Sequence, residues 1–343
     1  MALPAMLPIA TMSYPYHTPS PGPGSSSSRY PSRPPHHNSA SSTTYYHHPS
    51  SHRPASNPDL ATLQRLLRTL LPSRPRLTSS TPLRAPLHTL HLLQTSDGPS
   101  VLKTPAPSAT HLLRHETAAI ASEANVLTLL SRARLPTLPS TLAYDPSGTT
   151  SLPGPLLLRA FLSGTPYPSV QLPAQTRARL EGQLGAILAA VCGTRLGAFG
   201  STPAVWAGRG ARSWSAAFAG LVEQVLRDGE DVLLVLPYER IRGHVAAFSS
   251  ALDAITDARC VPLGLDESGI LVEERGGEWW VTGLLGWGGT EGGGARVRGL
   301  LYAVYRALVA IVTAHVRPGS GGEFEARRTL TAALGELDCE AAG

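Results

Sequence analysis

The segment Asp97-Gly-Pro-Ser-Val-Leu-Lys-Thr104 indicates most directly how this chain folds. It contains Lys103, the one lysine among 29 lysine and arginine residues. Since arginine carries the positive charge everywhere else, a surviving lysine marks a place that needs a compact, flexible ammonium group. Asp97-Gly98 is a hairpin signal that follows the apolar run 87–93, so Lys103 is predicted to lie on the second strand of a hairpin. Chance survival of a lysine in a loop is the alternative.

A helical pattern downstream of that strand offers a partner for the lysine. Apolar residues recur at helical spacing over residues 110–131, and Glu123 lies within this segment. A strand lysine that pairs with a helix glutamate is how kinase-like folds hold the α- and β-phosphates of ATP. Glu116 is an alternative partner, one helix face away. A pair that only braces the fold would contribute about 1 kcal/mol at most if it is exposed.

The remaining periodicities predict an α+β protein with two lobes. Asn57-Pro-Asp59 can cap a helix that ends before Pro72. Strands are expected around residues 83–95, 100–104 and 152–161, with a strand hairpin over 269–282. Helices are expected over residues 175–192, 213–228, 238–255, 296–315 and 323–337. This order gives a strand-rich N-lobe over residues 58–160 and a mostly helical C-lobe over 161–338, with 339–343 as a tail.

Residues 1–57 differ in composition from the rest of the chain. They are rich in Ser, Pro, His and Tyr, contain no Asp or Glu, and show no apolar periodicity. Such a segment buries too little apolar surface to offset its chain entropy, so we expect a disordered tail. Its paired histidines, such as His36-His37, have no preformed geometry, so no structural metal site is expected there.

Charge and hydropathy narrow the classes of partner. The formal net charge is +5 over 343 residues, and Arg29, Arg33 and Arg53 of the tail supply three of these charges. The body is therefore nearly balanced, and no basic stripe with interleaved aromatic residues indicates nucleic-acid binding. No stretch approaches the ~20 uninterrupted apolar residues of a membrane span. We therefore expect neither nucleic acid nor membrane as a partner.

The cysteines and the N-terminus bear on the cellular compartment. Cys192, Cys260 and Cys339 are distant in sequence, lack metal-ligand spacing and fit small buried roles in a reducing compartment. The first ten residues contain two prolines and no basic residue, which argues against a signal peptide. The acid-free, Ser-rich N-terminus leaves a mitochondrial presequence open, although its prolines disfavour an amphipathic helix. A cytoplasmic location is expected.

The order of the expected elements resembles that of the aminoglycoside phosphotransferase and choline kinase superfamily, which has a protein-kinase-like fold. A strand lysine, a helix glutamate, a linker strand, helices, and a hairpin carrying I-L-V and then V-T-G-L-L follow one another. The chain is more narrowly similar to the fungal branch of that superfamily, over about residues 60–338. The strings that carry this similarity are Leu112-Leu-Arg-His-Glu116, Ser213-Trp-Ser-Ala-Ala-Phe218, Leu236-Pro-Tyr-Glu-Arg-Ile-Arg242, Ala251-Leu-Asp-Ala-Ile-Thr256 and Leu300-Leu-Tyr-Ala-Val-Tyr305.

The resemblance implies a catalytic site whose chemical residues are replaced here. The superfamily motif H-G-D-L-x-x-x-N-I-L-V corresponds to Pro262-Leu-Gly-Leu-Asp-Glu-Ser-Gly-Ile-Leu-Val272. Gly264 stands where an aspartate orients the acceptor hydroxyl, and Gly269 stands where an asparagine binds magnesium. In Val281-Thr-Gly-Leu-Leu-Gly-Trp-Gly288, Gly286 stands where a second aspartate binds metal. Glycine offers neither a base nor a ligand, so no catalytic metal is expected.

The nucleotide site that the resemblance implies is incomplete as well. Residues 77–89 contain no glycine, so no loop of main-chain amides is expected to close around phosphates there. What remains is Lys103 with Glu123, and the linker strand, which in the superfamily presents main-chain groups to adenine. We therefore name Lys103, Glu123, Arg159 and Phe161 as candidate cofactor-binding residues. Any ATP is expected to bind weakly and independently of magnesium.

Three functions are consistent with these residues. The first is a pseudokinase, a superfamily member without catalysis that acts as a binding or regulatory module for a small molecule or a protein. The second is an active ATP-dependent small-molecule phosphotransferase that uses Asp266 and Glu267 as displaced acids, although shifts of ~1 Å already impair catalysis. The third is a fold retained without a ligand. Loss of the catalytic base alone would lower the rate by roughly 10²–10⁴.

Overall fold

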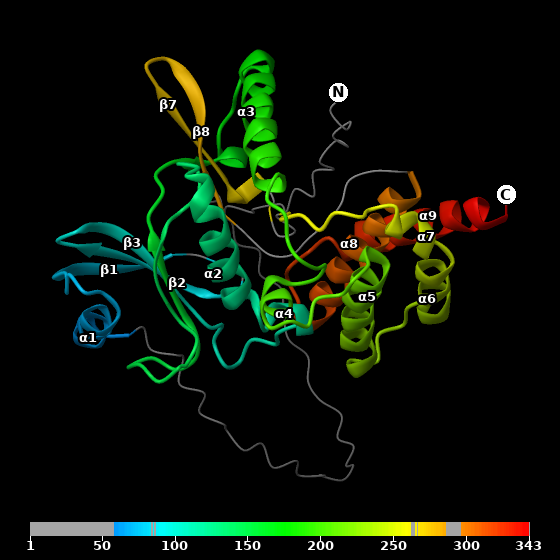
Figure 1. The fold of residues 1–343 in the computed structure, drawn as a ribbon, viewed down its shortest axis with the longest axis horizontal. Coiled ribbons are helices and arrows are strands. Elements are labelled where there is room, and N and C mark those ends of the chain that lie inside the picture. Colours follow the sequence, from blue (N-terminus) through cyan, green and yellow to red (C-terminus); the bar gives the residue numbers. More distant parts are fainter. Residues whose placement is uncertain are drawn as a thin grey trace, which may run out of the picture.

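The computed structural model describes residues 58–83, 85, 87–261, 265, 267–285 and 296–342. These residues form one lobe built on a β-sheet and a second lobe built mainly on helices (Figure 1). The expected α+β architecture with two lobes is therefore confirmed. The expected disordered tail, residues 1–57, lies outside the described residues.

The sheet of the N-lobe consists of antiparallel strands in the order β1-β2-β3-β5-β4. Their bounds are β1 Leu77–Leu83, β2 Thr89–Thr95, β3 Gly98–Thr104, β4 Thr141–Asp145 and β5 Leu156–Ala160. The turn between β2 and β3 is the predicted Asp97-Gly98, and Gly98 has a φ of 110°, which L side chains rarely adopt. The strand that carries Lys103 is thus the central one, with hydrogen-bonded neighbours on both sides.

One helix packs on each face of this sheet. Helix α1, Leu60–Leu70, begins where Asp59 Oδ1 accepts a hydrogen bond from the Thr62 amide at 2.6 Å. Its leucines pack against β2, β3 and β5 on one face, whereas α2, Ala119–Leu130, packs on the other. Because side chains alternate along a strand, Leu102 faces α1 and Lys103 faces α2.

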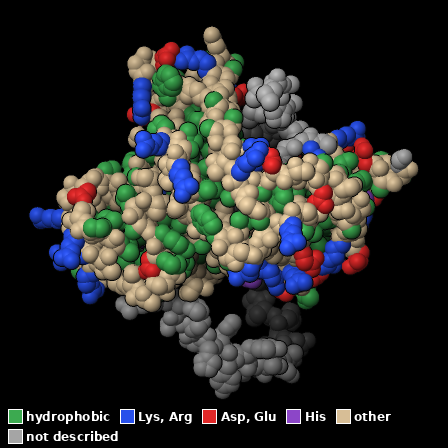
Figure 2. Space-filling view, in the orientation of Figure 1, with side chains coloured by type: hydrophobic (Ala, Val, Ile, Leu, Met, Phe, Trp, Pro, Cys, Tyr) green, Lys and Arg blue, Asp and Glu red, His purple; other side chains and the backbone are tan. Residues whose placement is uncertain are grey.

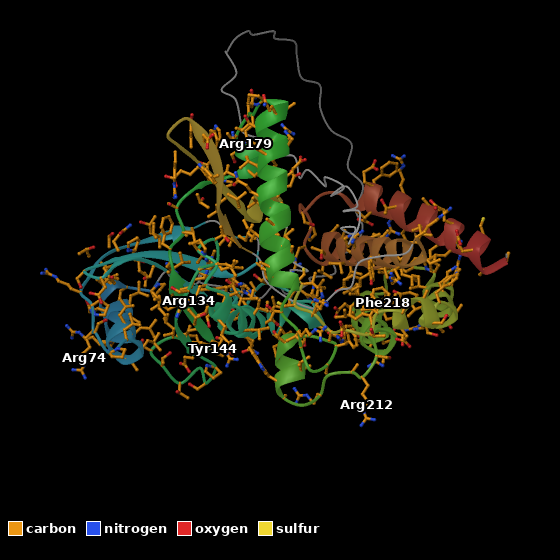
Figure 3. All side chains as sticks on the ribbon, turned by 45° about the horizontal axis from the view of Figure 1, so that its top comes forward. Arg74, Arg134, Tyr144, Arg179, Arg212 and Phe218 are labelled. Atoms are coloured by element: carbon orange, nitrogen blue, oxygen red, sulfur yellow. The ribbon has the colours of Figure 1, made fainter. Side chains whose placement is uncertain are left out.

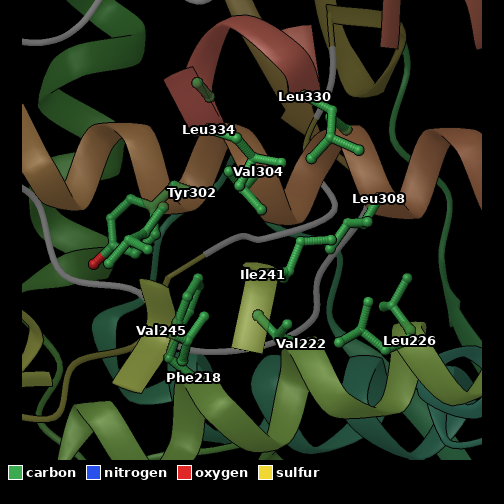
Figure 4. Close-up of a cluster of buried hydrophobic side chains, with 14 of the residues drawn as sticks. Phe218, Val222, Leu226, Ile241, Val245, Tyr302, Val304, Leu308, Leu330 and Leu334 are labelled. Atoms are coloured by element: carbon green, nitrogen blue, oxygen red, sulfur yellow. The ribbon is translucent and has the colours of Figure 1, made fainter. Parts of the chain in front are cut away.

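The helical lobe is held together by a core with an aromatic centre (Figure 4). Trp214 and Phe218 are fully buried, and the Trp214 indole donates a 2.8 Å hydrogen bond to the Tyr302 hydroxyl. The helices of this lobe are α3 Ala174–Cys192, α4 Thr202–Trp206, α5 Trp214–Asp231, α6 Tyr238–Ala247, α7 Ser249–Asp253, α8 Arg296–Val316 and α9 Glu323–Ala342. Helices α8 and α9 lie side by side and pack with α5 and α6 around this core.

A small sheet joins the two lobes. It contains β6 Thr165–Pro166, β7 Ile270–Arg275 and β8 Glu278–Leu284, with the β7–β8 turn at Gly276-Gly277 as expected. The apolar side chains of β7 and β8 share one buried cluster with α2 and α3. Strands β7 and β8, which carry the apolar residues of the two motifs, therefore share a buried cluster with the helix that carries Glu123.

The segment between β3 and α2 is fastened to the helical lobe. Leu113 belongs to the core of that lobe, and the short 3₁₀ turn η1, Arg114–Glu116, follows it. Arg114 Nη1 lies 2.5 Å from Oδ1 of the buried Asp228 on α5, whose Oδ2 accepts from the Arg114 amide at 3.0 Å. Arg317 binds Glu116 through both carboxylate oxygens, at 2.6 and 2.7 Å. These contacts fix the approach to α2 and so the position of Glu123.

Several element bounds differ from the sequence-based expectation. Strands β1 and β4 were not expected from the sequence. They lie at the two edges of the sheet, where short or polar sequences are tolerated, and β1 contains Pro82. The expected helix over 238–255 is interrupted at Phe248, which has non-helical dihedrals. Helix α9 continues to Ala342, so the residues from 339 that were expected to be a tail are helical.

Helix α8 is, among the described residues, the one helix long and apolar enough to cross a membrane by length and composition. Arg306 interrupts its apolar sequence, which is why it escapes a search for uninterrupted apolar runs. Its buried residues, including Leu301, Leu308 and Ile311, belong to the core of the helical lobe. Of its apolar window, 39% is buried within this packing.

Candidate functional site

Lys103 and Glu123 form the predicted ion pair. The Lys103 Nζ atom lies 2.6 Å from Glu123 Oε2, and the two side chains are only 15% and 5% exposed. Strand β3 fixes the lysine between two neighbouring strands, and α2 fixes the glutamate above it. The alternative partner, Glu116, binds Arg317 instead.

A second cation approaches the same carboxylate. Arg159 on β5 pairs with Val101 across the sheet, so it lies on the same face as Lys103 and one strand away. Its Nε atom lies 3.3 Å from Glu123 Oε1, while Lys103 holds Oε2. The Arg159 residue is 6% exposed, and its Nε makes no well-directed hydrogen bond with the described residues. The structure thus brings together three of the four predicted cofactor-binding residues.

The electrostatics of this cluster favour an ionised glutamate. Burial alone would raise the pKa of Glu123, but the charges of Lys103 and Arg159 outweigh it and hold the pKa below its ordinary value. Burial lowers the pKa of Arg159, and the charge of Glu123 opposes that shift. A guanidinium stays protonated at neutral pH in such surroundings. One carboxylate therefore faces two cations.

His88, which the sequence did not single out, is the fourth member of this cluster. It lies just before β2, and both of its ring nitrogens are buried without a hydrogen-bond partner among the described residues. Burial first, and then the charge of Lys103, lowers the pKa of His88 to about 4. The imidazole is therefore neutral at physiological pH. Its position next to an apolar strand gave no chemical signal in the sequence.

At Gly269, main-chain atoms of Leu285 occupy the space that a side chain would need. Gly269 ends the turn η4, Glu267–Gly269, and its carbonyl accepts a 2.8 Å hydrogen bond from the Leu285 amide. A Cβ atom at position 269 would conflict sterically with the carbonyl oxygen of Leu285. The other two glycines that stand at motif positions, Gly264 and Gly286, lie outside the described residues.

Of the two displaced acids, only Glu267 falls within the described residues; Asp266 lies outside them. Burial raises the pKa of the Tyr167 phenol, and the charges of Glu181 and then Glu267 add to this rise against the opposing charge of Arg177. The turn η4 packs against η3, Tyr167–Ser169, and against β6. Glu267 thus lies on a turn that packs beside η3 and β6, the elements that follow the linker.

In the linker after β5, two main-chain groups form hydrogen bonds within the fold. The Phe161 amide donates to the Pro99 carbonyl at 3.4 Å, and the Ser163 carbonyl accepts from the Thr282 hydroxyl at 2.8 Å. The Phe161 side chain is 39% exposed. These two main-chain groups are therefore already hydrogen-bonded within the fold.

Within the described residues, no group of three or more His, Cys, Asp or Glu side chains could hold a metal ion. Cys260 is buried and Cys192 is half-buried, and burial raises the thiol pKa of both. Cys339 is exposed on α9, which corrects the expectation that all three cysteines have buried roles.

Two open hollows, with volumes of about 490 and 530 Å³, lie away from the cation cluster on α5 and α6. They share Arg242, which binds Glu223 at 3.0 Å and Glu230 at 2.7 Å. Acidic and basic side chains are interspersed over this lobe on the face shown in Figure 2. Arg242 and Arg240, which line these hollows, are therefore both engaged in ion pairs.

Comparisons with known proteins establish the fold. No model of a protein family matches the sequence, and no curated protein matches it significantly. Among solved structures, a protein from Ralstonia eutropha JMP134 assigned as an aminoglycoside phosphotransferase matches with a TM-score of 0.54 and 11% identity, over 83% of this chain and 98% of that one. The choline kinase LicA from Streptococcus pneumoniae matches with a TM-score of 0.51 and 11% identity, over 81% and 99% of the two chains. The chain therefore has the kinase-like fold of these two structures.

Proposed function

We propose that this chain is a phosphotransferase-like protein that binds a nucleotide beside Lys103 and serves as a binding or regulatory module instead of a magnesium-dependent kinase. The contact between Gly269 and Leu285 carries this proposal, because main chain fills the position where the resemblance places a magnesium ligand. Phosphoryl transfer depends on positioning and on neutralisation of charge by metal and cations. A site that lacks this ligand keeps the means to bind phosphate but not to transfer it.

The nucleotide is proposed as the ligand on two grounds. The Lys103–Glu123 pair is formed and largely buried, in the arrangement that holds ATP phosphates in kinase-like folds. A structure of LicA, which has the same fold, contains AMP. An adenine nucleotide bound here would place its phosphates at Lys103 and its base towards the linker at Phe161.

Calorimetry with ATP, ADP and AMP, in magnesium and in EDTA, tests this function. We expect weak binding whose dissociation constant changes less than about twofold between the two conditions, because no metal contributes to the site. Lys103→Ala should abolish binding. Arg74→Ala is the matched control, because Arg74 is exposed and points into solvent beyond α1 (Figure 3).

The same samples, supplied with labelled ATP, test for turnover. We expect no transfer of label to water or to small-molecule acceptors at the 1–100 s⁻¹ typical of kinases. Tight binding that requires magnesium, or turnover at such rates, would overturn the proposal and favour a kinase that uses Asp266 and Glu267. If no nucleotide binds, the proposal is refuted and the third function, a fold retained without a ligand, is favoured.

A further inference from the structure

Counted over the residues that the structure describes, the cluster around Glu123 carries a net positive charge. Lys103 and Arg159 are both cationic, and Glu123 is the one carboxylate that either of them contacts among the described residues. Their side chains are 15%, 7% and 5% exposed. His88 adds no charge at neutral pH, and Glu116, whose charge also reaches His88, is held by Arg317. The formal charge of the cluster is thus +1.

A buried net charge is unfavourable unless a counter-ion accompanies it. Removing an ion from water is costly, and two cations on one carboxylate leave half of the positive charge without a partner. Proteins usually balance such charges within the fold, as this chain does where the Arg317 guanidinium pairs with the Glu116 carboxylate. The imbalance near Lys103 is therefore evidence for a ligand that supplies the missing negative charge.

The cluster also has hydrogen-bond capacity that the fold does not use. The Arg159 Nε is buried without a well-directed acceptor, and neither ring nitrogen of His88 has a partner among the described residues. An ammonium group offers three donors, and Lys103 uses one of them on Glu123. Unsatisfied buried donors of this kind are rare and require an explanation. An oxyanion would accept from all three side chains.

We propose that Lys103, Arg159 and His88 bind a phosphoryl group as a metal-free anion, with Arg159 supplying the second positive charge that a metal ion supplies in a magnesium site. This inference rests on the proposed function and adds the residue that makes the site independent of metal. A guanidinium fork binds a phosphoryl group with two donors at once. In this arrangement Glu123 orients the two cations, and its own negative charge lowers the affinity of the site for the anion.

The charge model makes an unusual prediction for Glu123→Gln. If the glutamate served only to position the lysine, its loss would weaken phosphate binding. In the charge model its loss raises the net charge to +2, so the anion should bind more tightly. Arg159→Leu leaves a neutral Lys103–Glu123 pair. It should lower the affinity for the anion by about tenfold or more, the loss expected for a charge-assisted hydrogen bond.

The experiment measures the rise in melting temperature caused by sulfate, inorganic phosphate and AMP in EDTA. Sulfate keeps its two charges across the pH range, so its effect reports the protein alone. We expect the rise to be largest for Glu123→Gln, intermediate for the unmodified chain and smallest for Arg159→Leu. Arg159→Lys should retain a part of the rise, and Arg74→Ala should leave it unchanged. Without any anion, Arg159→Leu should melt at or above the temperature of the unmodified chain.

The outcomes separate this inference from the proposed function. Equal anion effects in the unmodified chain and in Arg159→Leu would overturn the role of Arg159, even if AMP still bound. Weaker anion binding in Glu123→Gln would overturn the charge model in favour of simple positioning. A response to sulfate and phosphate without any response to AMP would support the anion site and refute the nucleotide as its ligand. No response to any of the three would refute both.

Discussion

At the scale of single residues, Gly269 decides whether a side chain fits where the resemblance places a magnesium ligand. Gly269 has an ordinary backbone conformation, so a side chain there is excluded by its surroundings and not by its dihedral angles. The nearest obstacle is the Leu285 carbonyl, which belongs to main chain and cannot rotate aside as a side chain would. The packing around this position therefore requires glycine. Asparagine at this position would have to displace the main chain at Leu285, just after β8.

We predict that Gly269→Ala lowers the free energy of unfolding by about 1–3 kcal/mol, the usual cost of overpacking. Gly335→Ala is the control, because Gly335 lies inside α9 with open space around its Cα. That change should raise the free energy of unfolding by roughly 0.5–1 kcal/mol, since alanine favours a helix. Urea unfolding of both variants measures the difference. Equal stability of Gly269→Ala and the unmodified chain would show that the site has room for a side chain.

At the scale of elements, η1 and α5 form one of the connections between the lobes. Asp228 accepts hydrogen bonds from both the side chain and the amide of Arg114, and it is 4% exposed. We predict that Asp228→Ala lowers the free energy of unfolding by about 2–3 kcal/mol, because charged hydrogen bonds lose their acceptor. Asp257→Ala is the control, since the Arg195–Asp257 pair is exposed and should contribute less than about 1 kcal/mol. Denaturant titrations followed by tryptophan fluorescence compare the two, and an equal loss would contradict the interlobe role.

The elements also show what the sequence could and could not predict. Regular periodicity placed α1, α3, α5 and α8 and the β7–β8 hairpin close to their observed bounds. Lys103 and Glu123 were predicted as partners because the strand and the helix were each recognisable. Arg159 was named as a candidate, but its contact with Glu123 depends on the pairing of β3 with β5, which no local pattern reveals. Strand β1 was missed because an edge strand exposes one side and needs no continuous apolar run.

On the scale of the whole molecule, three histidines are folded into surroundings that disfavour their charged form. Burial is the first cause that lowers the pKa of each of His88, His91 and His115. The unfolded chain binds protons at these side chains near pH 6.5, whereas the folded chain does not until lower pH, about 4 for His88. The unfolded state therefore binds more protons in this interval, and stability must fall as the pH falls through it.

We predict that the free energy of unfolding decreases steadily from pH 7 to pH 5. The carboxylates with lowered pKa values, such as Glu123 and Glu116, lose their stabilising contribution only below about pH 4.5, so this window isolates the histidines. His88→Gln should flatten the profile, because glutamine keeps a polar side chain without a proton equilibrium, and His111→Gln at an exposed site should not. Urea titrations at pH 7, 6 and 5 provide the measurement.

An anion bound in the cluster would oppose this loss of stability, since its charge favours the protonated imidazole of His88. Sulfate should therefore flatten the pH profile of the unmodified chain but not that of Arg159→Leu. A stability that is constant between pH 7 and pH 5 would show that these imidazoles are solvated and that His88 does not belong to a closed cluster.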